Sequence, residues 1–183
     1  MTNSPQIAVL IPCYNEALTI AKVIHDFRAQ LPDATLYVFD NASSDNTATI
    51  AKELDVDVYY VKHRGKGNVV RQMHRFIQAD IYIMVDGDDT YPAEYVQTLI
   101  APIINKQADM VVGSRLLDNS TSEFKLLNKW GNRFFLVVLN TIFRVKLTDI
   151  LSGYRAMTRE LVENIPLLSA GFEIETELTI RTL

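Results

Sequence analysis

Residues 81–89 read Ile-Tyr-Ile-Met-Val-Asp-Gly-Asp-Asp, an apolar run that ends in a cluster of carboxylates. An unbroken apolar run of this length is typical of a strand that is covered on both faces, as in a parallel sheet. Ligands bind outside the carboxyl ends of the strands in such sheets. The aspartates that follow this run therefore lie where a ligand site is expected.

Short apolar runs alternate with amphipathic stretches on both sides of this segment. The runs that predict strands are residues 7–11, 36–39, 58–61, 81–85 and 110–112. Apolar residues at helical spacing predict helices over residues 20–31, 47–54, 69–77 and 93–105. With right-handed crossovers, this order predicts an α/β fold, a mostly parallel sheet with helices on both faces.

Composition limits the classes of protein to which the chain can belong. Its 183 residues fit a single domain, and 18 basic against 22 acidic residues give a formal net charge of −4. A nucleic-acid-binding domain is normally basic, so we expect no nucleic-acid partner. The single cysteine, Cys13, cannot form an internal disulfide and fits a reducing compartment. No apolar run reaches the roughly 18–20 residues of a membrane span.

Asp86 and Asp88 are the sharpest chemical feature of the sequence. Two carboxylates one residue apart, on a turn that leaves a buried strand, can hold Mg²⁺ or Mn²⁺, which bind one or two carboxylates together with substrate phosphates. An ordinary acidic turn is the alternative, because Asp-Gly favours turns. A further aspartate, Asp40, ends a neighbouring predicted strand and favours the metal site.

Other polar residues also follow predicted strands. Asp40 could accept hydrogen bonds from a base or a ribose, or else cap the segment 41–46. The glycine-rich, basic segment 63–68, which contains Lys66, is either an anion site before a helix or a flexible turn. Arg115 follows the last predicted strand, and its planar guanidinium group suits phosphate oxygens.

Residues 124–145 form one long, apolar-rich helical pattern with lysines and arginines around it. Such a helix belongs either to the core or to a membrane surface, where basic residues flank an apolar face. The sequence leaves both alternatives open.

Several motifs together resemble the family-2 glycosyltransferases of GT-A fold, especially the polyprenyl-phosphate sugar transferases of the dolichol-phosphate mannose synthase type. The matching segments are IPCYNE 11–16, FDNASSDNT 39–47, GKG 65–67, VDGDD 85–89, VGSR 112–115, TDILSGYR 148–155 and GFEIE 171–175. They occur in family order along nearly the whole chain. One departure is Asp-Asn-Ala-Ser at 40–43, where mannose synthases tend to have Asp-Asp-Gly-Ser.

The resemblance implies a role for each matching residue. Residues that would contact the nucleotide sugar are Pro12, Tyr14, Glu16, Asp40, Lys66, Asp86 and Arg155. Asp86 and Asp88 would hold Mg²⁺ or Mn²⁺ on the diphosphate, and Arg115 would lie by the phosphates or the acceptor. Lys125 or Lys129 would meet an acceptor phosphate.

The reaction that the resemblance implies moves a hexose, with inversion, from UDP or GDP to a polyprenyl (undecaprenyl or dolichyl) phosphate. A phosphate acceptor is mostly dianionic at pH 7 and needs no general base. A sugar hydroxyl, the alternative acceptor, needs one, for which Asp149 is the first choice and Glu173 or Glu175 weaker ones. Asp88, Arg115 and Asp149 are therefore the expected catalytic residues. A nucleotide-sugar-binding domain without turnover is the alternative from another class.

The expected organisation is one GT-A domain over 1–183, with a nucleotide-sugar-binding half at 1–115 and an acceptor-side half at 116–183. The last residues form a helical pattern without a capping signal, so we expect the second half to be incomplete. Many relatives continue into membrane-associated helices. The resemblance implies a cytoplasmic protein, peripheral to the cytoplasmic face of the membrane, and leaves its oligomeric state open.

Overall fold

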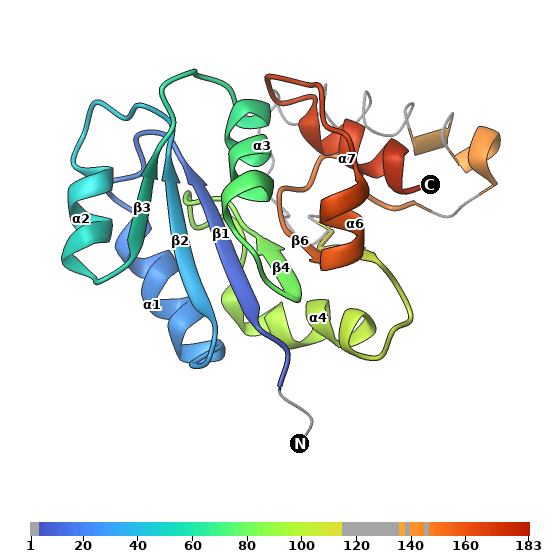
Figure 1. Cartoon of the computed structure of the whole chain (residues 1–183), viewed down its shortest axis with the longest axis horizontal. Coiled ribbons are helices and arrows are strands. Elements are labelled where there is room, and N and C mark those ends of the chain that lie inside the picture. Colours follow the sequence, from blue (N-terminus) through green and yellow to red (C-terminus); the bar gives the residue numbers. More distant parts are fainter. Residues whose placement is uncertain (1–3, 115–135, 138–139, 145–146) are drawn as a thin grey trace, which may run out of the picture.

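The computed structural model describes residues 4–114, 136–137, 140–144 and 147–183. Its strands are β1 (Ile7–Cys13), β2 (Thr35–Asp40), β3 (Asp57–Tyr60), β4 (Ile81–Met84), β5 (Met110–Val112) and β6 (Arg155–Thr158). Its helices are α1 (Ile20–Gln30), α2 (Thr47–Glu53), α3 (Lys66–Phe76), η1 (Ala93–Tyr95), α4 (Val96–Ile104), α6 (Arg159–Asn164) and α7 (Ile174–Thr182). The α/β alternation predicted for the first part of the chain is confirmed (Figure 1).

The strands form one sheet in the order β3-β2-β1-β4-β6-β5. Strands β1 to β4 run parallel, and β6 pairs antiparallel with both β4 and β5. The predicted mostly parallel sheet is therefore confirmed, but β6 was not predicted. Its four residues begin with a charged arginine and lack the apolar run or alternation that indicates a strand.

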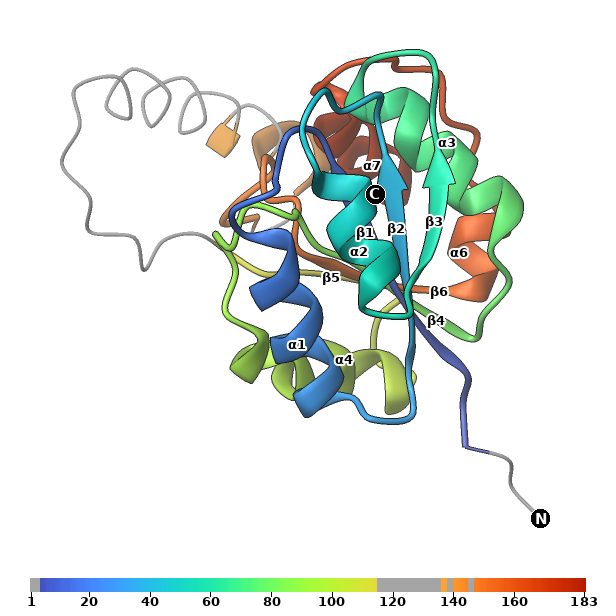
Figure 2. The same ribbon diagram turned by 90° about the vertical axis from the view of Figure 1, so that its left-hand side faces the viewer.

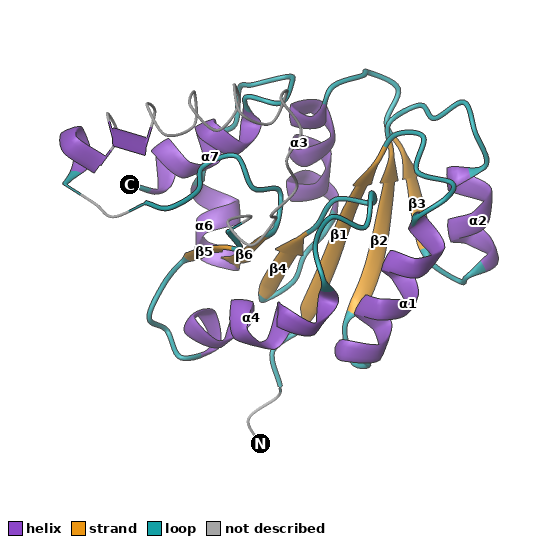
Figure 3. Cartoon of the chain, turned by 180° about the vertical axis from the view of Figure 1, so that it is seen from behind, coloured by secondary structure: helices purple, strands orange, loops and turns teal. Residues whose placement is uncertain are grey.

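Alternate side chains of the strands enter two separate layers of core, because successive residues of a strand point to opposite faces. Val9 and Ile11 pack with α1 and α4 on one face, whereas Ala8 and Leu10 pack with α3, α6 and α7 on the other. Figures 2 and 3 show these two groups of helices on opposite sides of the sheet. Both faces are thus covered, as predicted.

Strand β1 continues two residues beyond the expected end at Ile11. It pairs with β4 only as far as Leu10, whereas it pairs with β2 as far as Cys13. Pro12 therefore lies where only β2 is a neighbour, and its missing N–H breaks no ladder toward β4. This extension brings Cys13 beside Asp40, so that the ends of β1 and β2 meet at one edge.

The two expected halves of the chain share this one sheet. Strand β6, from the 116–183 half, lies between β4 and β5, which belong to the 1–115 half. Of the expected long helix at 124–145, residues 136–137 and 140–143 are helical, and the remainder lies outside the described residues. In the part of the chain that the structure describes, no helix is long and apolar enough to cross a membrane.

Candidate functional site

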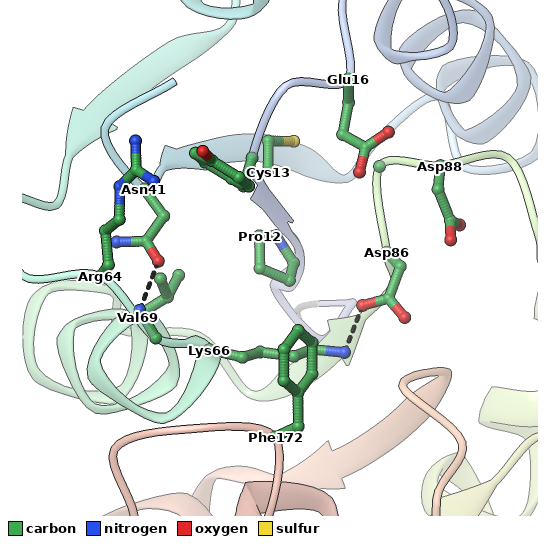
Figure 4. Close-up of a pocket in the computed structure, with 13 residues that line it drawn as sticks. Pro12, Cys13, Glu16, Asn41, Arg64, Lys66, Val69, Asp86, Asp88 and Phe172 are labelled. Atoms are coloured by element: carbon green, nitrogen blue, oxygen red, sulfur yellow. Dashed lines mark hydrogen bonds and ion pairs between the residues drawn. The ribbon is translucent and has the colours of Figure 1, made fainter. Parts of the chain in front are cut away.

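A cavity of about 320 Å³ lies at the carboxyl ends of β1, β2 and β4 (Figure 4). This volume falls in the range of small-molecule sites. The predicted residues that line it are Pro12, Tyr14, Glu16, Lys66, Asp86 and Asp88. The structure therefore brings together, at the edge predicted from strand order, residues that are as much as 76 positions apart (12 to 88).

The loops after β1 and β2 are joined to each other at one side of the cavity. The Asn15 N–H donates to Ser43 Oγ over 3.0 Å, and the Glu16 N–H donates to Thr47 Oγ1 over 2.8 Å. These bonds fix the backbone at Asn15 and Glu16, directly after Tyr14. The Arg64 guanidinium lies 4.4 Å from the centre of the Tyr14 ring, a cation–π contact. This side of the cavity is thus aromatic and positively charged.

Asn41 is a cavity residue that the sequence analysis quoted in a motif without assigning it a role. Its Nδ2 donates to the carbonyls of Val61 and His63, and its Oδ1 accepts from the Gly65 N–H. All of the amide's polar atoms are thus used to fix the segment that enters α3. Asn41 also lines the cavity, so it shapes the wall that leads to Lys66.

Asp40 precedes Asn41 and is 3% exposed, but unlike Asn41 it is not among the residues that line the cavity. Its Oδ2 accepts from the Ser43 N–H over 3.2 Å, as expected for a carboxylate that caps the segment 41–46. Its Oδ1 is buried and has no hydrogen-bond partner among the described residues. A buried carboxylate oxygen without a donor is costly, so this atom has the chemistry to accept a bond from a ligand.

Lys66 begins α3 and lies between two carboxylates. Its Nζ is 2.5 Å from Asp86 Oδ1 and 2.6 Å from Glu175 Oε1. Burial alone would lower the pKa of Lys66, but the charges of Asp86 and Glu175 outweigh burial, and the pKa is raised. The glycine-rich segment thus places its lysine in the cavity as a fixed positive charge.

Glu16, Asp86 and Asp88 make the opposite end of the cavity acidic. Burial, followed by the negative charges of Asp88 and Asp86, raises the pKa of Glu16. The Thr90 N–H donates to Asp88 Oδ1, which keeps the turn after β4 in shape. The negative charges of these carboxylates repel one another, and a bound cation would relieve that repulsion.

The donor set at this end fits Mg²⁺ or Mn²⁺, because it consists of carboxylate oxygens. Among the described residues, no group of three or more His, Cys, Asp or Glu side chains is arranged to hold a metal ion. Asp86 and Asp88 would therefore supply two ligands, and a bound phosphate or water would have to complete the coordination. That is the usual way in which these metals bind beside phosphates.

Glycines allow the close packing around this end. A Cβ on Gly153 would lie 2.4 Å from Asp86 Oδ2, and one on Gly87 would lie 2.6 Å from Cys13 Sγ. Asp149 lies in the same segment as Gly153 but does not line the cavity. It is 7% exposed, and its Oδ1 accepts from the Leu151 N–H.

Arg155, expected to contact a nucleotide sugar, does not line the cavity in this structure. Its side chain is fully buried in β6, and its guanidinium donates to the carbonyls of Ile150, Ser152 and Glu175 and to Thr179 Oγ1. These bonds join the segment before β6 to α7. Arg155 therefore organises the structure behind the cavity, which a motif match could not distinguish from ligand contact.

Phe172 is a cavity residue that the sequence analysis quoted only within a motif. It stands between α6 and α7, lines the cavity beside Lys66, and is 80% exposed (Figure 4). Three of the predicted residues, Arg115, Lys125 and Lys129, lie outside the described residues. Their roles remain predictions.

A second cavity, of about 480 Å³, lies beyond the end of β5. Tyr91, Tyr95 and Tyr154 contribute aromatic rings to its wall, and Ser114 lies at its rim. The Tyr154 hydroxyl is buried without a partner among the described residues, and burial raises its pKa. Among the described residues, the lining of this cavity is more aromatic than that of the first and contains no paired carboxylates.

Known proteins share both the sequence pattern and the fold. Protein RfbJ of Shigella flexneri is 54% identical over 63% of this chain and 89% of its own length. Glycosyltransferase AglJ of Haloferax volcanii is 38% identical over 98% of this chain and 59% of its own length. The dolichol-phosphate mannosyltransferase of Pyrococcus furiosus is 28% identical over 96% of this chain and 53% of its own length. The chain thus spans little more than half the length of these last two relatives.

A solved structure also matches closely. Glucosyl-3-phosphoglycerate synthase of Mycobacterium tuberculosis, crystallised with Mn²⁺ and UDP-glucose, superposes with a TM-score of 0.80 and 25% identity. The match covers 98% of this chain and 64% of that protein. The family model described as glycosyl transferase family 2 matches residues 8–165. The chain therefore belongs to glycosyl transferase family 2 and has its GT-A fold.

Proposed function

We propose that this chain transfers a hexose from a nucleoside diphosphate to a polyprenyl phosphate, with inversion at the anomeric carbon and with the help of Mg²⁺ or Mn²⁺. The observation that carries the proposal is the cavity at the ends of β1, β2 and β4. One end of it holds Tyr14 and Arg64, and the other holds Asp86, Asp88 and Lys66. A nucleoside diphosphate complements both ends: its aromatic base suits Tyr14 and Arg64, and its anionic tail suits Lys66 and a metal ion held by the two aspartates.

The donor would lie across this cavity with its base toward β1 and β2. Pro12 and Tyr14 line the cavity and offer apolar surface to a base. Asp40 lies outside the lining, and its buried, unpartnered Oδ1 is proposed to accept a hydrogen bond from a base N–H or a ribose hydroxyl when the donor binds. Glu16 would stand near the ribose and the phosphates. Uridine and guanosine both carry a ring N–H and ribose hydroxyls that could make these contacts, so UDP- and GDP-hexoses are both substrates to test.

Bond breaking leaves negative charge on the departing diphosphate. A divalent cation on Asp86 and Asp88 would supply positive charge to that leaving group. Lys66 brings a second, permanent positive charge to the same end of the cavity. Arg115, which follows β5, is proposed to add a third. Charge held in place before the reaction lowers the barrier, because little has to reorganise during it.

The acceptor is proposed from the chemistry of the attacking group and from relatives. Relatives of this chain carry the names dolichol-phosphate mannosyltransferase, dolichyl-phosphate hexose transferase and polyprenol monophosphomannose synthase. A phosphate dianion attacks without a general base. Lys125 or Lys129 is proposed to bind it. The cavity lining fits an attack without a general base, because Asp149, the first choice for such a base, is buried and does not line the cavity.

A lipid-linked acceptor also implies where in the cell the protein would work. The protein would work at the cytoplasmic face of a membrane, where a polyprenyl phosphate presents its head group. The 116–183 half would form the acceptor side, although Phe172 and Glu175 of that half also reach the donor end.

The test is transfer of labelled hexose from UDP- and GDP-sugars to undecaprenyl phosphate, with undecaprenol as the matched acceptor without phosphate. The proposal expects metal-dependent product with the phosphate alone, and loss of at least about 100-fold in rate in Asp86→Asn and Asp88→Asn. Equal transfer to undecaprenol would contradict the phosphate acceptor and favour a hydroxyl acceptor with a general base. Nucleotide binding without transfer to any acceptor would support the binding domain without turnover.

A further inference from the structure

Lys66 carries one positive charge between two carboxylates that come from distant parts of the chain. Asp86 follows β4 and faces the cavity, whereas Glu175 lies in the first turn of α7. The side chains of Lys66, Asp86 and Glu175 are 11%, 23% and 5% exposed, respectively. The three charged groups therefore form a largely buried cluster of two ion pairs, in which Asp86 is the most exposed member.

Glu175 is the fixed end of this cluster. Its main-chain carbonyl accepts from the buried Arg155 guanidinium over 2.9 Å. The loop before α7 is seated on the start of α3, where the Gly67 N–H donates to the Gly171 carbonyl over 3.0 Å. A Cβ on Gly67 would lie 2.2 Å from the Ser169 carbonyl oxygen. The main chain at both ends of the Lys66–Glu175 contact is thus held in place.

Asp86, by contrast, has two possible partners for its carboxylate. Its Oδ1 is occupied by the Lys66 ammonium, as the dashed line in Figure 4 shows. A divalent cation arriving at Asp86 and Asp88 would meet that positive charge at close range, and like charges so close repel strongly away from bulk water. A nucleoside diphosphate brings anionic oxygens that can take Lys66 as a partner, and it supplies the missing metal ligands as well.

We propose that Lys66 is a resident counter-cation that blocks the metal site at Asp86 until a nucleoside diphosphate binds, and that Glu175 is the positioning residue that retains Lys66 during the exchange. Metal and nucleotide would then bind cooperatively. Because coupling between two binding events is reciprocal, each would strengthen the other by the same factor. This inference rests on the proposed function, since it assumes that metal and nucleotide share this cavity.

The test measures binding and not turnover. Mn²⁺ affinity is determined by titration calorimetry, or from the electron paramagnetic resonance signal of free Mn²⁺, alone and with saturating UDP or GDP. The wild-type protein is expected to bind Mn²⁺ at least about tenfold more tightly with one of the nucleotides than without, a coupling of ordinary size.

The deciding variant is the double substitution Lys66→Met with Glu175→Gln. It removes the ammonium together with the more buried of its two carboxylate partners, and it leaves Asp86 free for a metal ion. It is expected to bind Mn²⁺ alone about tenfold more tightly than the wild type, and to lose most of the coupling to the nucleotide. Lys22→Met is the matched control. Lys22 also pairs with an aspartate after β4, Asp89, but its side chain is 59% exposed. Its removal is expected to change Mn²⁺ affinity less than about twofold.

Glu175→Gln alone separates the two roles. Of the two carboxylates that pair with Lys66, this variant leaves only Asp86. The ammonium is then held more firmly at Asp86, so Mn²⁺ alone is expected to bind more weakly than in the wild type. A thermal unfolding curve for each variant checks that it is folded.

Two results would overturn the inference. If the double variant binds Mn²⁺ no more tightly than the wild type while Asp86→Asn abolishes that binding, the proposed function stands and Lys66 is no block. If the wild type binds neither Mn²⁺ nor either nucleotide, the proposed function fails and the inference falls with it.

Discussion

The two sides of the cavity are built by different means. The first side is made by the parallel strands β1, β2 and β4 and by the polar loops that follow them. Hydrogen bonds from main-chain N–H groups to side chains join the loops after β1 and β2. The second side carries Phe172 in the loop before α7, and it is supported from behind by the antiparallel strand β6, by α7 and by charged groups that are buried. The first side is marked in the sequence by repetition, whereas the second depends on single residues.

The comparison predicts where substitutions do most damage. Arg155→Met removes a buried guanidinium and leaves the carbonyls of Ile150, Ser152 and Glu175 without that donor. We expect the free energy of unfolding to fall by roughly 3–5 kcal/mol, because each buried acceptor left unpaired is costly. Urea unfolding monitored by circular dichroism measures the change.

Arg159→Met is the matched control for this substitution. Arg159 follows β6 directly and pairs with Asp80, but both side chains are 45% exposed. We expect its loss to cost about 1 kcal/mol or less. Equal effects of the two substitutions would mean that burial of Arg155 contributes nothing special to the second side.

A second prediction concerns pH and the buried imidazole of α3, the helix against which α7 packs. Burial lowers the pKa of His74 to about 4, and both ring nitrogens are buried without a partner among the described residues. Between pH 6.5 and about 4, the unfolded chain therefore binds a proton at His74 that the folded chain does not. Stability is thus fully present above pH 6.5 and falls as the pH is lowered, by up to about 3 kcal/mol.

Urea unfolding at pH 7, 6, 5 and 4 measures this dependence. His74→Leu is expected to flatten the curve between pH 6.5 and 4, and His25→Leu, at an exposed position of α1, is expected to leave it unchanged. A His74→Leu curve that remains parallel to the wild type would show that carboxylates alone produce the acid dependence.

The smallest expected effect lies on the first side of the cavity. Ala42, in the loop after β2, has a φ of 58°, in the left-handed region that glycine adopts more easily. Ala42→Gly should raise the free energy of unfolding by about 0.5 kcal/mol, since relief of strain exceeds the added entropy of the unfolded chain. Thermal unfolding with Ala21→Gly, inside α1, as the control should show the opposite sign. A loss of stability in Ala42→Gly would place the strain elsewhere.

The sequence predicted the first side well for a physical reason. Buried parallel strands require apolar runs, and the loops at their carboxyl ends require polar residues. Asp40 and Asp86 could therefore be identified from their positions directly at the end of such runs. The expected helices after β1, β2 and β3 begin within a few residues of those observed. The residue types at the cavity were therefore predictable from local pattern together with strand order.

The second side was predictable only in part. Strand β6 carries no periodic signal, and Arg155 matched a family motif that does not report burial. Glu175 was considered as a general base, but its partner Lys66 is 109 positions earlier (175 − 66), and no local pattern reports such a pair. Long-range charge pairs depend on the finished fold and not on neighbouring residues.

The position of β6 between β4 and β5 also affects how the chain folds. Strand β5 ends at residue 112, but its only partner among the described strands begins at residue 155. During synthesis, the edge of β4 therefore remains unpaired until the intervening chain and β6, its antiparallel neighbour, have emerged. An open edge of four buried, apolar residues is a ready site for wrong pairing. Closure of the sheet is thus a late, long-range event, and the interval before it is when a nascent chain of this kind most needs a chaperone.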